Sequence, residues 1–413
     1  MSKNAFENDS IISSQQADIL YETNFVSDVD IIVSISLEIE SDDLVSQNDL
    51  LYTVEVFPDD NVFFKINKFH YSHTIKKHFN YIKTKPNAKS NIDITIKVPN
   101  GTKCLFTIRN HFNRTGTVEI LNIRYLEYYL YNLPEFVNTN MKQQAFYQVR
   151  VNDVPFTFYT NFSEMKKKKI IFFFPGASTK KHKYDVQRYS WGAQLMNYET
   201  CFFADPTVSE TVLRIGWFQY SQENFGIDSL VTLINCIVQI KGYQESDIVF
   251  FGSSAGGFVA LKLAEYFARA TVIAINPQIY LFNYHKTFYQ KMLDVCYPNT
   301  NPNKIQELFL NRISVHRIVA DRVGKTFIFQ NKYDQLHYQK HIGDYLNNNK
   351  LWNNVSSINQ FDVNNIKNNF NVIFYEDEKL GHTPPNRDVC INYIHSILSS
   401  DKNNVIHQFS YSW

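Results

Sequence analysis

A serine between two glycines is the residue best placed to do chemistry in this sequence. Residues 247–251, DIVFF, are typical of a buried strand, and residues 252–256, GSSAG, lead into a helical pattern. A strand, a tight G-x-S-x-G turn and a helix form a nucleophile elbow, in which glycines leave the space that a Cβ atom would fill. The sequence therefore predicts Ser254 as an exposed nucleophile, with Ser253 as the next candidate. An ordinary strand-to-helix loop is the alternative.

Such a serine needs a histidine as base and a carboxylate that orients it, in the chain order Ser, Asp, His. Asp334 follows the apolar run 326–330, TFIFQ, just past the carboxyl end of a predicted strand. His382 lies in the loop 380–385, LGHTPP, which follows another apolar run. We predict a triad of Ser254, His382 and Asp334 that transfers an acyl group through an acyl-Ser254 intermediate.

Four other residues compete for these roles. His337 and His341 have helical spacing, but no third metal ligand stands at a recognisable distance, so we predict solvated histidines and no metal site. Asp321 precedes its strand, and Glu376 is too close to His382 in the chain to orient it. These two acids would be the next candidates if Asp334 does not hold the histidine.

Backbone N–H groups must also face the negative charge that develops on a tetrahedral intermediate. One donor would be the amide of Ala255, directly after the nucleophile. The apolar run 169–174, KIIFFF, leads into the PGAS turn, where Gly176 lets the amide of Ala177 face the site. We predict an oxyanion hole made by Ala255, Ala177 and Gly176, with a plain turn as the alternative.

These motifs together resemble the α/β-hydrolase superfamily over residues 166–400. A subgroup found among bacterial surface-polysaccharide biosynthesis proteins is similar in four further stretches: RYSW (188–191), ADPT (204–207), IGWF (215–218) and AINPQ (274–278). That subgroup resembles capsule O-acetyltransferases and, more distantly, the serine-hydrolase-like protein of the accessory Sec system. The oxyanion loop lacks the His-Gly opening of many lipases, so lipase-like substrate handling is not implied.

The resemblance implies an O-acetyltransferase with acetyl-CoA as acyl donor, a surface glycan as acceptor and no required cofactor. An esterase or deacetylase would use the same triad with water as acceptor. A non-catalytic assembly factor in polysaccharide export is a third hypothesis. Trp191, Trp217 and Arg188 are the candidates for binding the substrate, although core tryptophans would look the same in the sequence.

The chain has 413 residues, more than the ~250 of one hydrolase domain, so we expect a second unit. Residues 25–135 alternate apolar and polar positions between turns, which predicts a small β-sandwich-like domain. We expect a loose N-terminus over 1–24 and a connector over 136–165. The predicted α/β-hydrolase catalytic domain, residues 166–413, has a mostly parallel sheet with helices on both faces and strands near 170, 200, 212, 248, 272, 326 and 372.

The charge and cysteine content of the chain limit which classes of partner and which cellular compartments we expect. Lys and Arg total 41 against 40 Asp and Glu, which argues against bulk attraction to nucleic acid or anionic membranes. The five cysteines show no C-x-x-C pattern, which suits reduced thiols. The sequence shows no signal peptide and no apolar run of ~18 residues. We expect a cytoplasmic protein without a transmembrane segment, which leaves room for peripheral association with polysaccharide machinery.

Overall fold

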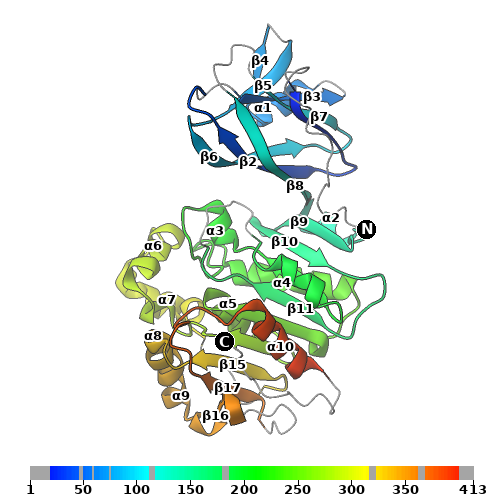
Figure 1. Cartoon of the computed structure of the whole chain (residues 1–413). Helices are drawn as coiled ribbons and strands as arrows, with labels where there is room; N and C mark the ends of the chain where they lie inside the picture. The colour runs from blue at the N-terminus through cyan, green and yellow to red at the C-terminus, as the bar shows by residue number, and fades with distance from the viewer. Residues whose placement is uncertain are drawn as a thin grey trace. The chain divides into compact units, whose positions relative to one another are not determined.

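The computed structural model describes residues 19–45, 50–57, 60–73, 76–110, 117–178, 186–315, 322–360 and 368–399. The chain forms two compact units (Figure 1). One comprises residues 1–131 and 145–148, and the other comprises residues 132–144 and 149–413.

In the first unit, antiparallel strands form two groups around one apolar core, with the orders β1-β7-β3-β5-β4 and β8-β2-β6. The core-facing side chains of β2 include Val33, Ile35 and Leu37, because successive side chains of a strand point to opposite faces. The elements of this unit are β1 (Ile19–Val26), β2 (Ile31–Ser41), β3 (Leu50–Phe57), α1 (Asn61–Ile66), β4 (His70–Ser72), β5 (Lys77–Ile82), β6 (Ala88–Val98), β7 (Lys103–Asn110) and β8 (Val118–Asn132).

The second unit is built on strands in the order β16-β17-β15-β14-β13-β11-β12-β10, followed by part of β9. Neighbours from β16 to β12 are parallel, whereas β10 is antiparallel to β12. Central strands are buried along their whole length, which explains why they read as continuous apolar runs. The strands are β9 (Gln144–Val151), β10 (Val154–Asn161), β11 (Ile170–Phe174), β12 (Glu199–Phe203), β13 (Ile248–Ser253), β14 (Thr271–Ile275), β15 (Thr326–Asn331), β16 (Val355–Ser357) and β17 (Phe370–Tyr375).

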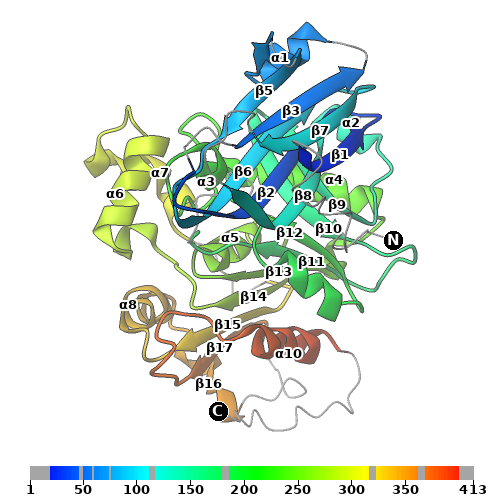
Figure 2. The same ribbon diagram turned by 45° about the horizontal axis from the view of Figure 1, so that its top comes forward.

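Helical segments cover both faces of this sheet (Figure 2). Consecutive residues of β13 show this directly, since Phe250 contacts Phe267 just after α5, whereas Phe251 contacts Trp191 of η1. None of the helices in the described ranges is long and apolar enough to cross a membrane. The helices are α2 (Leu133–Val137), η1 (Tyr189–Gln194), α3 (Pro206–Glu210), α4 (Gly226–Ile240), η2 (Glu245–Asp247), α5 (Ala255–Leu263), η3 (Leu281–Asn283), α6 (Lys286–Cys296), α7 (Pro302–Ile313), α8 (Gln335–His337), η4 (Tyr338–Gly343), α9 (Asp344–Asn349), η5 (Trp352–Asn354), η6 (Ile358–Gln360) and α10 (Arg387–Leu398).

Three segments differ from what the sequence predicts. Residues 19–24, expected to be loose, belong to β1 and pair with β7. Residues 136–165, expected to be a connector, contain β9 and β10. The apolar run near 212, expected to be a strand, is a loop. Local apolar patterns indicate burial here, but they do not decide which segments pair.

Buried hydrogen bonds explain why residues 211–225 form a loop. The Asp205 carboxylate accepts the N–H of Phe218 at 3.2 Å, which draws the backbone away from strand pairing. Trp217, Phe218 and Tyr220 all have positive φ. Non-glycine residues adopt such angles only where the surrounding structure holds them. The loop is therefore a fixed part of the structure, and it carries Trp217 inward.

Candidate active site

Ser254 lies on the sharp turn between β13 and α5. Its backbone has φ 54° and ψ −118°, a conformation that non-glycine residues rarely adopt. The neighbouring glycines make the turn possible. A Cβ atom at Gly252 would lie 2.1 Å from the carbonyl oxygen of Gly256, and one at Gly256 would lie 2.3 Å from the carbonyl oxygen of Phe174. Neither glycine position accepts a side chain without moving the backbone.

Ser254, His382 and Asp334 form a continuous hydrogen-bonded chain. The Oγ of Ser254 lies 2.9 Å from Nε2 of His382, and Nδ1 of His382 lies 2.6 Å from Oδ2 of Asp334. The side chain of His382 is 36% exposed, whereas Asp334 is 6% exposed. This geometry allows His382 to take the serine proton while Asp334 holds its other nitrogen.

The loop that carries His382 is held by its backbone. Asn276, directly after β14, donates from Nδ2 to the carbonyl oxygen of His382 at 3.2 Å. Asn331, at the end of β15, donates from Nδ2 to the carbonyl oxygens of Gly381 and Asp377 at 2.9 and 2.7 Å. Two asparagines at strand ends therefore set the position of the histidine relative to the sheet.

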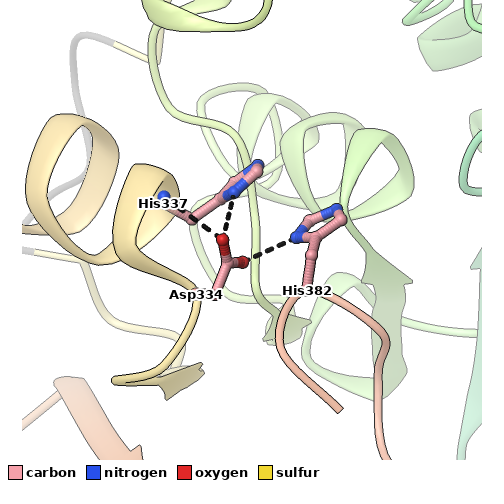
Figure 3. Close-up of side chains that lie close together, drawn as sticks. All are labelled: Asp334, His337 and His382. Atoms are coloured by element: carbon pink, nitrogen blue, oxygen red, sulfur yellow. Dashed lines mark hydrogen bonds and ion pairs between the residues drawn. The ribbon is translucent and has the colours of Figure 1, made fainter. Parts of the chain in front are cut away.

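Asp334 lies between two histidines (Figure 3). Its Oδ1 is 2.9 Å from Nδ1 of His337, and the imidazole of His337 stacks on that of His382 with ring centroids 4.0 Å apart. His337 is only 1% exposed, so the prediction that it is solvated is wrong. The reason is local. Asp334 is the N-cap residue of α8, and its carboxylate also accepts the backbone N–H of His337, which places the side chain of His337 beside that carboxylate.

His341 is also buried, and the prediction of a solvated position is wrong for it as well. Its Nδ1 accepts the backbone N–H groups of Ile279 and Tyr280 at 3.2 and 3.3 Å. Burial holds the pKa of His341 well below its ordinary value. This histidine is therefore neutral near pH 7 and holds the backbone that follows β14.

The environment keeps the carboxylate charged and its buried neighbour neutral. Burial raises the pKa of Asp334, but hydrogen bonds from His337 and His382 outweigh it and hold that pKa well below its ordinary value. Burial lowers the pKa of His337. Ligand atoms of these three residues lie within 4.8 Å of one another, close enough for a metal ion to be considered. Each Nδ1 already faces its own carboxylate oxygen, so hydrogen bonding accounts for the arrangement.

One more side chain contacts the nucleophile. Gln278, three residues past β14, is fully buried, and its Nε2 lies 2.9 Å from Oγ of Ser254 and 3.1 Å from Nε2 of His337. Its Oε1 accepts Nε1–H of Trp217 at 3.0 Å. Gln278 thus closes a hydrogen-bonded ring with Ser254, His382, Asp334 and His337. The sequence signal for it was its place in the AINPQ stretch, beyond the carboxyl end of a strand.

The predicted substrate-binding residues have different environments. Trp217 is 0% exposed beneath Gln278, so its ring is not accessible to a substrate in this structure. Trp191 is partly exposed, with Arg188 5.4 Å from its ring centroid. Nη2 of Arg188 donates to Oγ of Ser253 at 2.6 Å, and burial lowers the pKa of Arg188. Ser253 is therefore engaged with Arg188 beside the elbow.

The predicted oxyanion-hole residues lie next to the nucleophile. Ala255 is the first residue of α5, where a backbone N–H has no partner within the helix. A Cβ atom at Gly176 would lie 4.0 Å from Cβ of Ser254, so the turn that holds Gly176 and Ala177 passes beside the serine. The amino end of α5 favours negative charge at this place.

Of the two other acids, Glu376 is exposed and pairs with Lys332 at 2.8 Å. Asp321 lies outside the described residues.

No protein-family model and no curated protein matches the sequence. Similar solved structures include the capsule O-acetyltransferase of Neisseria meningitidis serogroup A, with 17% identity, a TM-score of 0.40, and coverage of 60% of this chain and 96% of that chain. A Glycosylation Associate Protein complex from Streptococcus agalactiae matches with 10% identity, a TM-score of 0.44, and coverage of 87% and 61%. Esterase 2 of Thermogutta terrifontis matches with 12% identity, a TM-score of 0.40, and coverage of 63% and 97%.

These similar structures include a capsule O-acetyltransferase and an esterase. Identities below 20% and TM-scores below 0.5 say nothing about the substrate of this chain. The assignment of a function therefore depends on its own side chains.

Proposed function

We propose that the chain is an enzyme of the α/β-hydrolase fold that transfers acyl groups through an acyl-Ser254 intermediate. The observation that carries this proposal is the hydrogen-bonded chain from Ser254 through His382 to Asp334, with distances of 2.9 and 2.6 Å. The strand order supports the fold, since the serine follows central β13, the acid follows β15 and the histidine follows β17. In this proposal the first unit is a β-sandwich domain.

The first half-reaction follows from the geometry. Oγ of Ser254 attacks the acyl carbonyl carbon while Nε2 of His382 takes the hydroxyl proton. Backbone N–H groups of Ala255 and Ala177 would stabilise the negative oxygen of the tetrahedral intermediate. As the bond to the leaving group breaks, His382 returns the proton to that group and acyl-Ser254 remains. Asp334 stays ionised throughout and stabilises the imidazolium.

For the second half-reaction, we propose transfer to a hydroxyl group of a bacterial capsular or other surface polysaccharide, with acetyl-CoA as donor. The support is the similarity of the RYSW, ADPT, IGWF and AINPQ stretches to polysaccharide biosynthesis proteins. An acceptor hydroxyl gives its proton to His382 as its oxygen attacks the acyl carbon of acyl-Ser254. The bond between that carbon and Oγ of Ser254 then breaks, and His382 returns the proton to Oγ. Water in the same place would make the protein an esterase or deacetylase.

Two supporting assignments belong to this proposal. Arg188 and Trp191 remain candidates for contact with the substrate, because they lie beside the elbow with Trp191 partly exposed. A cytoplasmic location agrees with the five cysteines, all of which are free and buried. A purely structural role in polysaccharide export is disfavoured, because an assembly factor has no use for a complete triad.

Two measurements test the proposal. A fluorophosphonate probe should label the protein on Ser254, and Ser254→Ala should prevent labelling. Incubation with acetyl-CoA and a panel of capsule-type oligosaccharides should then add acetyl groups, detected by mass. Free acetate released at the same rate with and without every glycan would instead identify an esterase. A native protein that is never labelled would contradict serine chemistry altogether.

A further inference from the structure

The proton positions around Ser254 follow from one group that can only donate. An indole N–H donates and cannot accept, so the amide oxygen of Gln278 must be the atom that faces Nε1 of Trp217, 3.0 Å away. The amide nitrogen must then face Oγ of Ser254 and Nε2 of His337. The orientation of a glutamine amide is ordinarily inferred from its partners, and here a donor-only partner decides it.

This orientation sets the tautomer of the buried histidine. Because an N–H of Gln278 points at Nε2 of His337, that nitrogen carries a lone pair and the proton is on Nδ1. Nδ1–H then donates to Oδ1 of Asp334 at 2.9 Å. If Nε2 of His337 were also protonated, its N–H would face the N–H of Gln278, and two donors would oppose each other. The pKa of His337, which burial lowers, agrees with a neutral ring.

The second amide proton of Gln278 decides the direction of the serine hydroxyl. It donates to Oγ of Ser254 at 2.9 Å, so the O–H of the serine must seek a different acceptor. That acceptor is Nε2 of His382, whose Nδ1–H is engaged by Oδ2 of Asp334. Two paths of hydrogen bonds therefore lead from the amide N–H groups of Gln278 to the carboxylate of Asp334, one through Ser254 and His382 and the other through His337. In both paths each donor points toward Asp334.

We infer that Gln278 is a catalytic residue that directs the proton of Ser254 to His382, and that His337 and Trp217 are positioning residues that hold Gln278. The inference rests on the proposed acyl-transfer function. As the serine proton moves to His382, the N–H of Gln278 remains on Oγ and stabilises the negative charge that builds there. The same contact assists Oγ when it leaves the acyl group in the second half-reaction.

The position of the indole is itself fixed by the 211–225 loop. Asp205 holds the N–H of Phe218, and Oγ1 of Thr207 accepts the N–H of Tyr220 at 3.0 Å. A Cβ atom at Gly216 would lie 2.4 Å from Cβ of Thr207, so the loop fits closely against α3. Gln278 must be held rigidly to align Ser254, and this loop provides such a support through Trp217.

The test measures the second-order rate constant for labelling by a fluorophosphonate, which reports the reactivity of Ser254 without a known substrate. Gln278→Met keeps the side-chain volume and removes both donors, and Gln278→Glu keeps the shape. Both should label ~10- to 100-fold more slowly, as expected for a misaligned nucleophile. In acetyl transfer, kcat should fall while KM stays unchanged. Trp217→Phe, which removes the N–H together with part of the ring, should show the same effect at a smaller size.

A matched control is Gln330→Met, the same substitution at another buried glutamine, whose amide donates to the backbone carbonyl of Asn331. It should leave the labelling rate within about twofold of the native rate. Native protein that is not labelled at all would overturn the proposed function. Native protein that is labelled, with Gln278 variants that react equally fast, would overturn only this inference.

A second measurement needs no variant. Nitrogen-15 NMR of the histidine side chains in native protein should show His337 and His382 both protonated on Nδ1 alone. A proton on Nε2 of His337 in the neutral ring would contradict the inference, whether or not the Gln278 variants fold.

Discussion

Two hydrogen-bonded routes connect Ser254 to Asp334, and they differ in their exposure. The route through His382 lies on a loop, and the side chain is 36% exposed. The route through Gln278 and His337 is buried, at 0% and 1% exposed. A base must meet the leaving group and the acceptor, so it needs access. An aligning group must not move, so it is best buried. This difference supports our proposal that His382 transfers the proton and that Gln278 and His337 orient the serine.

Loss of the accessible route should have the largest effect. Ser254→Ala should abolish acyl transfer, and His382→Ala should cost about as much, ~10⁴-fold or more in kcat, because triad members act as a unit. Both proteins should remain folded, as judged by circular dichroism, since neither side chain builds the apolar core. Retention of more than a few per cent of the native rate in Ser254→Ala would reject this serine as the nucleophile and direct attention to Ser253.

Asp334→Asn should damage both routes at once. An asparagine offers one acceptor and one donor where two imidazole N–H groups need acceptors, so one histidine must change its tautomer or lose its bond. We expect a ~10²- to 10⁴-fold loss of kcat, smaller than the loss of Ser254. Glu376→Gln, a carboxylate-to-amide change at an exposed ion pair, is the control and should be silent. A silent Asp334→Asn would show that another acid orients His382.

His337→Phe should break only the buried route. The ring volume stays, but Gln278 loses its acceptor and Asp334 loses one donor. We expect kcat to fall ~10-fold with KM unchanged, because misalignment of the nucleophile affects the chemical step. His395→Phe on α10, where the histidine lies 3.4 Å from the Tyr198 hydroxyl, is the matched control. Equal rates for the two variants would show that the buried route does not assist catalysis.

The free energy of unfolding should depend on pH through Asp205, which holds the loop that carries Trp217. Burial raises the pKa of Asp205 to about 6, above its value in the unfolded chain. The folded state therefore binds the proton more tightly, and stability should fall by about 1–3 kcal/mol as pH rises from about 4 to 6. Asp205→Asn should remove this part of the slope. Urea unfolding of the native protein and of Asp205→Asn between about pH 4 and 6 measures this pH dependence. If the free energy of unfolding changes equally with pH in both proteins, Asp205 is not its source.

The proposed triad could be predicted because each member has a local signature. Ser254 lies in a glycine turn between a strand and a helix, and Asp334 and His382 follow apolar runs in the expected chain order. Parallel strands bring their carboxyl ends to one edge of a sheet, so residues far apart in sequence meet there. The order of the chain and the direction of the strands were sufficient to place these three residues together.

The buried route could not be predicted in the same way. His337 lies at the start of a helical stretch in which α8 continues through the π-helical turn η4 into α9, so a regular helical period does not say which face is inside. The contact of Gln278 depends on Trp217, which lies on a loop that resembles a strand in sequence. Asp205 bends that loop through tertiary hydrogen bonds, and no local pattern reports them. Long-range polar contacts thus account for most of what the sequence did not reveal.

The backbone angles of Ser254 have a consequence for the stability of this protein. A non-glycine residue at φ 54° and ψ −118° costs on the order of 1–3 kcal/mol of folding free energy, whereas glycine adopts such angles without steric conflict. Under the proposed function, a chain with glycine at this position should lose acyl transfer and yet unfold at a higher temperature. Under the proposed function, the strain at Ser254 is thus a loss of stability that accompanies the exposure of the nucleophile on its turn.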